Sequence, residues 1–176
     1  RTGRPYTFKE RKLTVSELEY WQQYGITPEI LEQYKVCSVV QFQSENAEGN
    51  PFSYTSTKEE PIYGYKSKRF IKLYRPFSRT RFLYGGNIGE NYCFGLEQLP
   101  SKGDTLFITG GEKDVLSLAA RGFHAICFNS ETVTVPPNII YKLTFRFKHI
   151  ILLYDMDATG IESARKHEKQ LCEYGV

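Results

Sequence analysis

Two acidic turns contain the side chains best suited to chemistry. One is the segment 109–114 (TGGEKD) and the other is 155–160 (DMDATG), and each comes directly after a run of apolar residues. Two aspartates spaced one residue apart at the end of a strand can direct both carboxylates into one crevice. Mg²⁺ binds carboxylates, waters and substrate phosphates in such sites. The second turn therefore predicts a site for Mg²⁺ or Mn²⁺, with Asp155 and Asp157 as metal ligands.

These acids also have a structural interpretation. An aspartate caps a helix by accepting a backbone hydrogen bond, and a carboxylate in the first turn is favoured by the helix dipole. We favour the metal site because an apolar strand precedes Asp155. The spacing from Asp155 to Thr159 is also that of the nucleophile loop of haloacid-dehalogenase-type phosphatases. That loop follows the first strand of its domain, with most of the catalytic domain downstream, whereas only 17 residues follow Thr159 here. No G-K-[ST] follows the glycines of the first turn, which excludes a P-loop.

A basic, aromatic segment runs from 62 to 84 and contains no acidic residue. Cations along a groove neutralise phosphates and exposed rings stack on bases, which is typical of binding to single-stranded nucleic acid. The alternative is a basic sheet whose aromatic side chains form its core. An acid-free run of this length favours nucleic-acid contact. The residues predicted to bind nucleic acid are Lys66, Lys68, Arg69, Lys72, Arg75, Arg79 and Arg81.

The first part of the chain is expected to be a small, mixed, basic subdomain. Ser16 with Glu19 predicts a capping box for one short helix, and Thr27 with Pro28 predicts the start of a second. We expect these helices to form a packing hairpin and not a helix-turn-helix DNA reader, because the second helix has no base-reading surface. Short β-type runs predict an irregular sheet with strands at 39–42, 62–65, 70–74 and 82–84.

Regular alternation of strands and helices begins after residue 100, so we divide the chain into 1–100 and 101–176. Continuous apolar strands that alternate with helices indicate a parallel sheet buried on both faces. The expected class is α/β, a parallel sheet flanked by helices after an α+β subdomain. Ligands bind such sheets where strands end and helices begin, which is where both acidic turns lie. The expected strands are 106–109, 125–128 and 150–154, and the expected helices are 113–121, 137–143 and 161–173.

Composition limits the remaining function classes. The formal net charge of +3 does not by itself indicate a nucleic-acid partner. The cysteines form no C-x-x-C pair, so we expect reduced thiols in a cytoplasmic protein and no zinc. No apolar run reaches the roughly 20 residues needed to cross a bilayer, so we expect no membrane partner. The chain lacks an initial Met, and we expect it to be a fragment of a larger protein.

These motifs together resemble the toprim domain of bacterial and phage-type DNA primases. That core runs strand, glycine turn, helix, strand, helix, strand and D-x-D. The segment 154–160 (YDMDATG) looks like the family's Y-D-x-D-x-x-G, and 114–118 (DVLSL) matches its aspartate-led helix. Upstream, 24–29 (YGITPE) resembles the hairpin that opens the primase polymerase domain, and 94–98 (FGLEQ) resembles the segment before its toprim part.

One position departs from the family pattern. Toprim domains place a catalytic glutamate immediately before the glycine of the first turn, and alignment on Asp114 puts Gly110 there. Glu112, two residues later, is the candidate replacement. The resemblance then implies that Glu112, Asp155 and Asp157 are catalytic and that Asp114, Asp155 and Asp157 hold the metal.

The resemblance implies a DNA primase-like enzyme. It would bind a single-stranded DNA template and Mg²⁺ and join ribonucleoside triphosphates into an RNA primer, with a replicative helicase as a further partner. Gly110 favours an alternative, a catalytically silent toprim module that binds single strands in replication or mobile-element transfer. A third alternative is nuclease or topoisomerase chemistry, which we rank last because no candidate nucleophilic tyrosine lies in a recognisable context.

Overall fold

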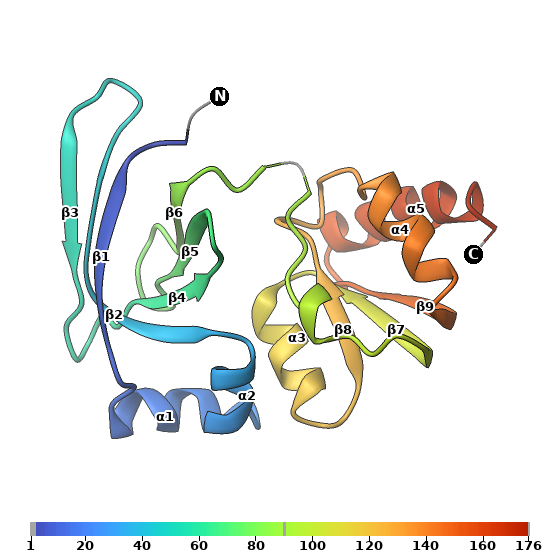
Figure 1. The fold of residues 1–176 in the computed structure, drawn as a ribbon, viewed down its shortest axis with the longest axis horizontal. Coiled ribbons are helices and arrows are strands. Elements are labelled where there is room, and N and C mark those ends of the chain that lie inside the picture. The colour runs from blue at the N-terminus through green and yellow to red at the C-terminus, as the bar shows by residue number, and fades with distance from the viewer. Residues whose placement is uncertain (1–2, 90, 176) are drawn as a thin grey trace. The chain divides into compact units, whose positions relative to one another are not determined.

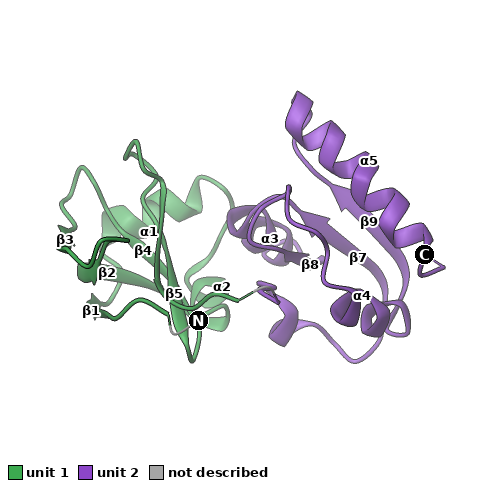
Figure 2. Ribbon diagram, turned by 90° about the horizontal axis from the view of Figure 1, so that it is seen from above, with its two compact units in different colours: residues 1–89 green, residues 90–176 purple. Residues whose placement is uncertain are grey.

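The chain forms two compact units. A computed structural model describes residues 3–89 and 91–175. The units are Arg1–Gly89 and Glu90–Val176, shown in different colours in Figure 2. We expected the division after residue 100. The division comes earlier because Phe94 forms a backbone bridge with Cys127, and Leu99 packs into the core of the second unit.

The first unit is an antiparallel sheet with two short helices (Figure 1). Its strands pair in the order β1-β2-β4-β5-β6, and β3 pairs with β2. The four predicted strands are confirmed within β2, β4, β5 and β6. β1 and β3 were not predicted, because their mixed polar sequences leave most of their side chains exposed or half-buried. The elements are β1 (Tyr6–Arg11), α1 (Val15–Gln22), α2 (Pro28–Gln33), β2 (Val36–Glu45), β3 (Pro51–Thr55), β4 (Tyr63–Lys66), β5 (Phe70–Tyr74) and β6 (Phe82–Gly86).

Both helices of this unit begin at threonine caps. The Thr14 hydroxyl accepts a hydrogen bond from the backbone of Glu17, and the Glu17 carboxylate accepts one from the backbone of Thr14 at 2.7 Å. This reciprocal pair is a capping box. The predicted capping box at Ser16 and Glu19 is wrong, because both residues lie inside α1. Thr27 caps α2 as predicted.

Both faces of the antiparallel sheet are packed. Successive side chains along a strand point to opposite faces. Leu73 therefore lies in one apolar cluster with Phe42, whereas its neighbour Tyr74 lies on the other face. There the Trp21 ring of α1 packs against Tyr63, with ring centres 4.9 Å apart. Several aromatic residues of the basic segment are thus core residues and cannot stack on bases.

The second unit contains a three-stranded parallel sheet in the order β8-β7-β9 (Figure 1). The expected α/β class is confirmed, and each expected strand and helix is present with small shifts at its ends. Among the described residues, no helix is long and apolar enough to cross a membrane. The elements are the 3-10 helix η1 (Leu96–Gln98), β7 (Gly103–Thr109), α3 (Glu112–Ala119), β8 (His124–Cys127), α4 (Pro137–Thr144), β9 (Phe147–Leu153) and α5 (Ala158–Cys172).

The core of this unit lies around β7, the central strand. Leu106 and Ile108 of β7 and Ile126 of β8 have no exposed surface, and they pack with Ile140 and Leu143 of α4. Strands and helices of this unit both contribute fully buried apolar side chains. The apolar runs in the sequence therefore predicted its elements well.

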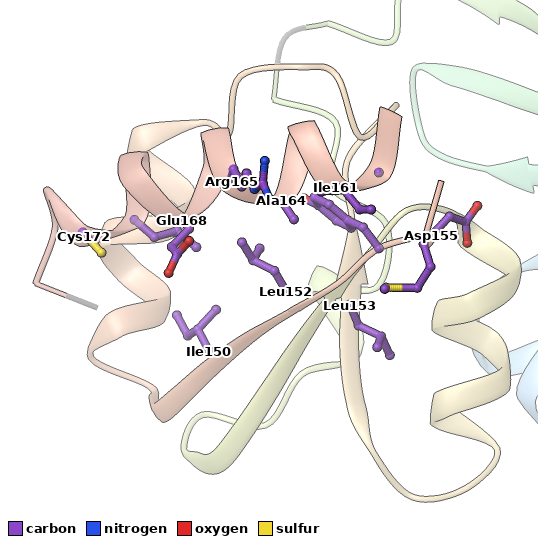
Figure 3. Close-up of a pocket in the computed structure, with 13 residues that line it drawn as sticks. Ile150, Leu152, Leu153, Asp155, Ile161, Ala164, Arg165, Glu168 and Cys172 are labelled. Atoms are coloured by element: carbon purple, nitrogen blue, oxygen red, sulfur yellow. The ribbon is translucent and has the colours of Figure 1, made fainter. Parts of the chain in front are cut away.

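Strand β9 differs from expectation. We expected it to be buried on both faces, and this is wrong, since Ile151 and Leu153 are 43% and 48% exposed. The exposure alternates along the strand, because Ile150 and Leu152 pack against the core of the unit while Ile151 and Leu153 point to the opposite, less covered face. Ile150, Leu152 and Leu153, together with residues of α5, line a groove of about 590 Å³. Figure 3 shows Asp155 at one end of this groove and Cys172 at the other.

Candidate functional site

The parallel sheet brings three turns to one edge. Thr109 of β7 lies opposite Cys127 of β8 and opposite Leu153 of β9. All three strands run in the same direction, so the chain leaves each of them at the same edge. This carboxyl edge is the usual place for a ligand site in such sheets. Both acidic turns predicted from the sequence lie there.

The turn after β9 carries Asp155 and Asp157, and both residues are exposed. Asp157 is also the N-cap of α5, because its Oδ1 accepts a hydrogen bond from the backbone of Gly160 at 2.8 Å. Gly160 is buried against the backbone of Asp155, where a Cβ would overlap the carbonyl oxygen. The capping bond and this close contact together fix the turn that presents Asp155 to solvent.

The turn after β7 places its two acids differently. Glu112 is 2% exposed, and its Oε1 accepts a hydrogen bond from the Tyr92 hydroxyl at 2.7 Å. The carboxylate proposed as the replacement catalytic acid is therefore enclosed by protein. Asp114 keeps an exposed surface at the start of α3. Partial desolvation raises the pKa of Asp114, the charge of Lys113 opposes this rise, and the charges of Asp155 and Glu112 add to it.

Glu131, which was not predicted as a site residue, lies at the same edge after β8. Burial raises its pKa, a hydrogen bond from the Asp155 backbone lowers it, and the charges of Asp155, Asp157 and Asp114 raise it again. Its carboxylate also lies against Gly110, where a Cβ would overlap it. The sequence could have indicated Glu131 as a site residue, because it lies in the loop after a predicted parallel strand and all such loops open at this edge.

The residues predicted to bind nucleic acid divide into buried and exposed groups. Lys72 and Arg75 are only 2% and 8% exposed. The Lys72 ammonium lies 4.8 Å from the ring centre of Phe82, and the Arg75 guanidinium lies 4.2 Å from that of Tyr54 and 3.8 Å from the Glu60 carboxylate. Both cations are therefore parts of the packed structure. The exposed members of the predicted set are Lys68, Arg69, Arg79 and Arg81.

The β5–β6 hairpin concentrates the exposed cations and rings. Arg79 and Arg81 lie in or next to its connection, and Phe77 in the same connection is 61% exposed. Tyr84 on β6 is 42% exposed. Lys66, on β4, is instead paired with Glu10 at 2.7 Å. The hairpin thus presents both phosphate-binding and base-stacking groups to solvent.

Comparison with solved structures defines the fold. Protein-family models give no match to the sequence, and no curated protein matches it. A solved DnaG catalytic core superposes with a TM-score of 0.65 at 17% identity, over 89% of this chain and 60% of its own. The chain has the fold of a primase catalytic core.

Other primase structures agree with this assignment. A DnaG primase catalytic domain solved with bound single-stranded DNA matches with a TM-score of 0.66 at 14% identity, over 89% of this chain and 61% of its own. The primase fragment of the bacteriophage T7 primase-helicase protein matches with a TM-score of 0.54 at 16% identity, over 84% and 58%. The chain spans about 60% of the length of the DnaG cores that it matches. The primase resemblance expected from the sequence is confirmed at the level of fold.

The donors at the acidic edge of this primase fold suit a hard cation. Within residues 3–89 and 91–175, no three Asp, Glu, His or Cys side chains form a ready-made cage for an ion. Mg²⁺ does not need one, because it keeps several waters and is commonly held by one or two carboxylates together with substrate phosphates. Asp155, Asp114 and Glu131 offer carboxylate oxygens of this kind. Their chemistry fits Mg²⁺ or Mn²⁺.

Proposed function

We propose that the chain is part of a primase-like enzyme that binds single-stranded DNA and Mg²⁺ for template-directed synthesis of an RNA primer. One observation carries the proposal. Carboxylates follow all three strands at the carboxyl edge of the sheet, where Glu131 accepts a hydrogen bond from the Asp155 backbone and feels the charges of Asp155, Asp157 and Asp114. They do so in a chain with the fold of primase catalytic cores. Carboxylates that repel one another are stabilised by a shared cation.

The residues of the edge have separate tasks in this proposal. Asp155 is exposed and held by a fixed turn, so it is the first candidate to bind the ion. Asp114 and Glu131 add negative charge beside it. Bound Mg²⁺ would supply positive charge to a reacting phosphate and its leaving group. Asp157 holds the start of α5 through Gly160 and so keeps Asp155 in place.

The template surface is proposed on the first unit. A DnaG domain of the same fold was solved with single-stranded DNA, which supports a DNA partner for this chain. The exposed groups of the β5–β6 hairpin, Arg79, Arg81 and Phe77, are the best candidates for contact. Cations would bind phosphates and the ring would stack on a base. The T7 fragment comes from a primase-helicase protein, so a helicase is the further partner that we propose.

Primer synthesis is the direct test. The chain, and a longer protein that contains it, would be incubated with single-stranded DNA, labelled ribonucleoside triphosphates and Mg²⁺ or Mn²⁺. We expect labelled primers from the wild type, and a loss on the order of 100-fold with Asp155→Ala, since one metal ligand is removed. Glu173→Gln, an exposed acid at the far end of α5, is the control and should retain activity. Equal synthesis by the Asp155→Ala variant would contradict the assignment.

Gly110 favours a second candidate function, a silent module that binds single strands without catalysis. The family position expected to hold a catalytic glutamate holds no side chain, and Glu112 is enclosed beside Tyr92. A silent module would bind single-stranded DNA with an affinity that does not depend on Mn²⁺ and would yield no primer. An active enzyme would yield primers whose formation requires the metal.

A further inference from the structure

Gly110 and Glu131 compete for one space at the acidic edge. A Cβ built on Gly110 would overlap the carboxylate of Glu131, with the carboxyl carbon 2.8 Å away. The backbone of Gly110 does not require glycine, because Gly110 is not among the glycines with positive φ. Its role is therefore to leave space. The space is filled by a carboxylate that comes from a different loop.

The loop that carries Glu131 is held in place by α5. Nε2 of His167 lies 2.8 Å from the carbonyl oxygen of Val133. The side chain of Gln170 makes two hydrogen bonds to the backbone of Val135, with its Nε2 donating at 2.7 Å and its Oε1 accepting at 3.2 Å. These contacts begin two residues after Glu131, so the acid projects from a fixed backbone.

The Glu131 carboxylate is also tied to the turn after β9. It accepts a hydrogen bond from the backbone of Asp155, and the negative charges of Asp155, Asp157 and Asp114 act on it. Like charges at short range are unfavourable unless a cation or a proton offsets them. The hydrogen bonds from α5 to the loop and the space left at Gly110 together keep the Glu131 carboxylate near the other acids of this edge. The arrangement is explained if a cation is shared there.

We propose that Glu131 completes the Mg²⁺-binding edge in place of a side chain at position 110. We call Gly110 and Glu131 an exchanged pair, because the acid expected at position 110 is absent and one is supplied from position 131 instead. The inference rests on the proposed function, which supplies the cation. It also replaces the sequence-based choice of Glu112, whose carboxylate is enclosed beside Tyr92.

The shared space is tested first, without metal. Gly110→Ala should lower the Tm of the wild-type chain on the order of 5 °C, because the new Cβ displaces the Glu131 carboxylate. In a Glu131→Gly background the same substitution should have little effect. An equal loss of Tm in both backgrounds would show that the two residues do not compete, and the exchanged pair would be abandoned.

The carboxylate is tested next, with Mn²⁺ as the probe and electron paramagnetic resonance titration as the readout. Glu131→Gln keeps the shape of the side chain and should weaken Mn²⁺ binding on the order of tenfold or more. Gly110→Glu combined with Glu131→Gly should recover binding to within about threefold of the wild type. Glu173→Gln, at the end of α5, should leave binding unchanged.

The outcomes separate the inference from the function on which it rests. Mn²⁺ binding that Asp155→Ala abolishes and Glu131→Gln leaves intact overturns the role of Glu131 while the proposed function stands. Failure of the combined variant to recover binding that Glu131→Gln has lost overturns the exchange. Absence of Mn²⁺ binding to the wild type overturns the metal part of the proposed function, and the inference with it.

Discussion

The hydroxyl of Tyr154 lies 2.6 Å from Nδ1 of His167, and Nε2 of the same ring lies 2.8 Å from the carbonyl oxygen of Val133. A carbonyl oxygen only accepts, so Nε2 carries the proton and Nδ1 accepts from the Tyr154 hydroxyl. His167 has no exposed surface. A neutral imidazole therefore links the residue before Asp155 to the loop that follows Glu131.

We predict that protonation of His167 destabilises the fold. Burial lowers its pKa, the Val133 carbonyl opposes this change, and the charge of Lys166 adds to it. An unfolded histidine has a pKa of about 6.5. As the pH falls through that value, the unfolded chain binds a proton that the folded chain does not, so the free energy of unfolding decreases. Below the folded-state pKa the loss levels off.

Urea unfolding of the wild type and of His167→Phe between about pH 8 and pH 5 measures this effect. The variant should be less stable at the higher pH, since Tyr154 and Val133 each lose a partner. Its stability should also depend less on pH than that of the wild type. Parallel pH profiles for the two proteins would count against the assignment.

Glu17 should be essential for the stability of the first unit. It is 4% exposed, and its carboxylate accepts hydrogen bonds from the backbone of Thr14 and the hydroxyl of Ser38, both at 2.7 Å. Glu17→Ala removes a helix cap and leaves a buried hydroxyl without its acceptor, so we expect a loss of about 2–3 kcal/mol in denaturant unfolding. Glu19→Ala, on the same helix but exposed, should cost less than about 0.5 kcal/mol. Similar losses for both would refute this role.

Single-strand binding should depend on the exposed cations of the β5–β6 hairpin. Replacing Arg79 and Arg81 with Ala should weaken binding to single-stranded DNA. The slope of log K against the logarithm of the salt concentration should become shallower by about 1.4, which is about 0.7 for each lost phosphate contact. The measurement is fluorescence anisotropy at several salt concentrations. Lys142→Ala with Lys148→Ala, in the second unit, removes the same charge elsewhere. An equal change in slope for both double variants would show only a net-charge effect.

Gly160→Ala should disturb the turn that presents Asp155. The new Cβ would overlap the Asp155 carbonyl oxygen, so the turn or the start of α5 must shift. We expect a loss of about 1–3 kcal/mol in stability and weaker Mn²⁺ binding. Thr159→Ala, an exposed neighbour, is the matched control, and its stability should stay within about 0.5 kcal/mol of the wild type. Unchanged stability in Gly160→Ala would mean that the close backbone contact is not important.

The sequence predicted elements best where apolar runs are buried. Ile108 and Ile126 belong to strands that were predicted, because their runs lie in the core of a parallel sheet. Strand β1 was missed although Tyr6 and Phe8 alternate with polar residues and pack against the apolar cluster, because its other residues are exposed and polar and it is held by pairing with β2. β9 was found, but its burial was overestimated, because an apolar run does not reveal whether both faces of a strand are covered.

The candidate site was predicted only in part, since local sequence does not show which loops meet. Asp155 was predicted because it follows a strand within one motif. Glu131 was missed because its relation to Gly110 joins loops after different strands. Lys72 is buried against Phe82, and Arg75 is buried against Tyr54. These contacts come from other strands, so the basic character of the segment does not indicate them.

The shared space at Gly110 also restricts the mutational routes open to this protein over evolution. A side chain cannot be gained at position 110 while Glu131 keeps its present place, because the two would overlap. Loss of Glu131 first would leave the edge one acid short. A lineage that moves the acid from one loop to the other must therefore either displace the Glu131 carboxylate first or lose it first. If Glu131 serves the edge as we propose, searches that require an acid at one fixed alignment column would overlook a carboxylate that comes from the neighbouring loop.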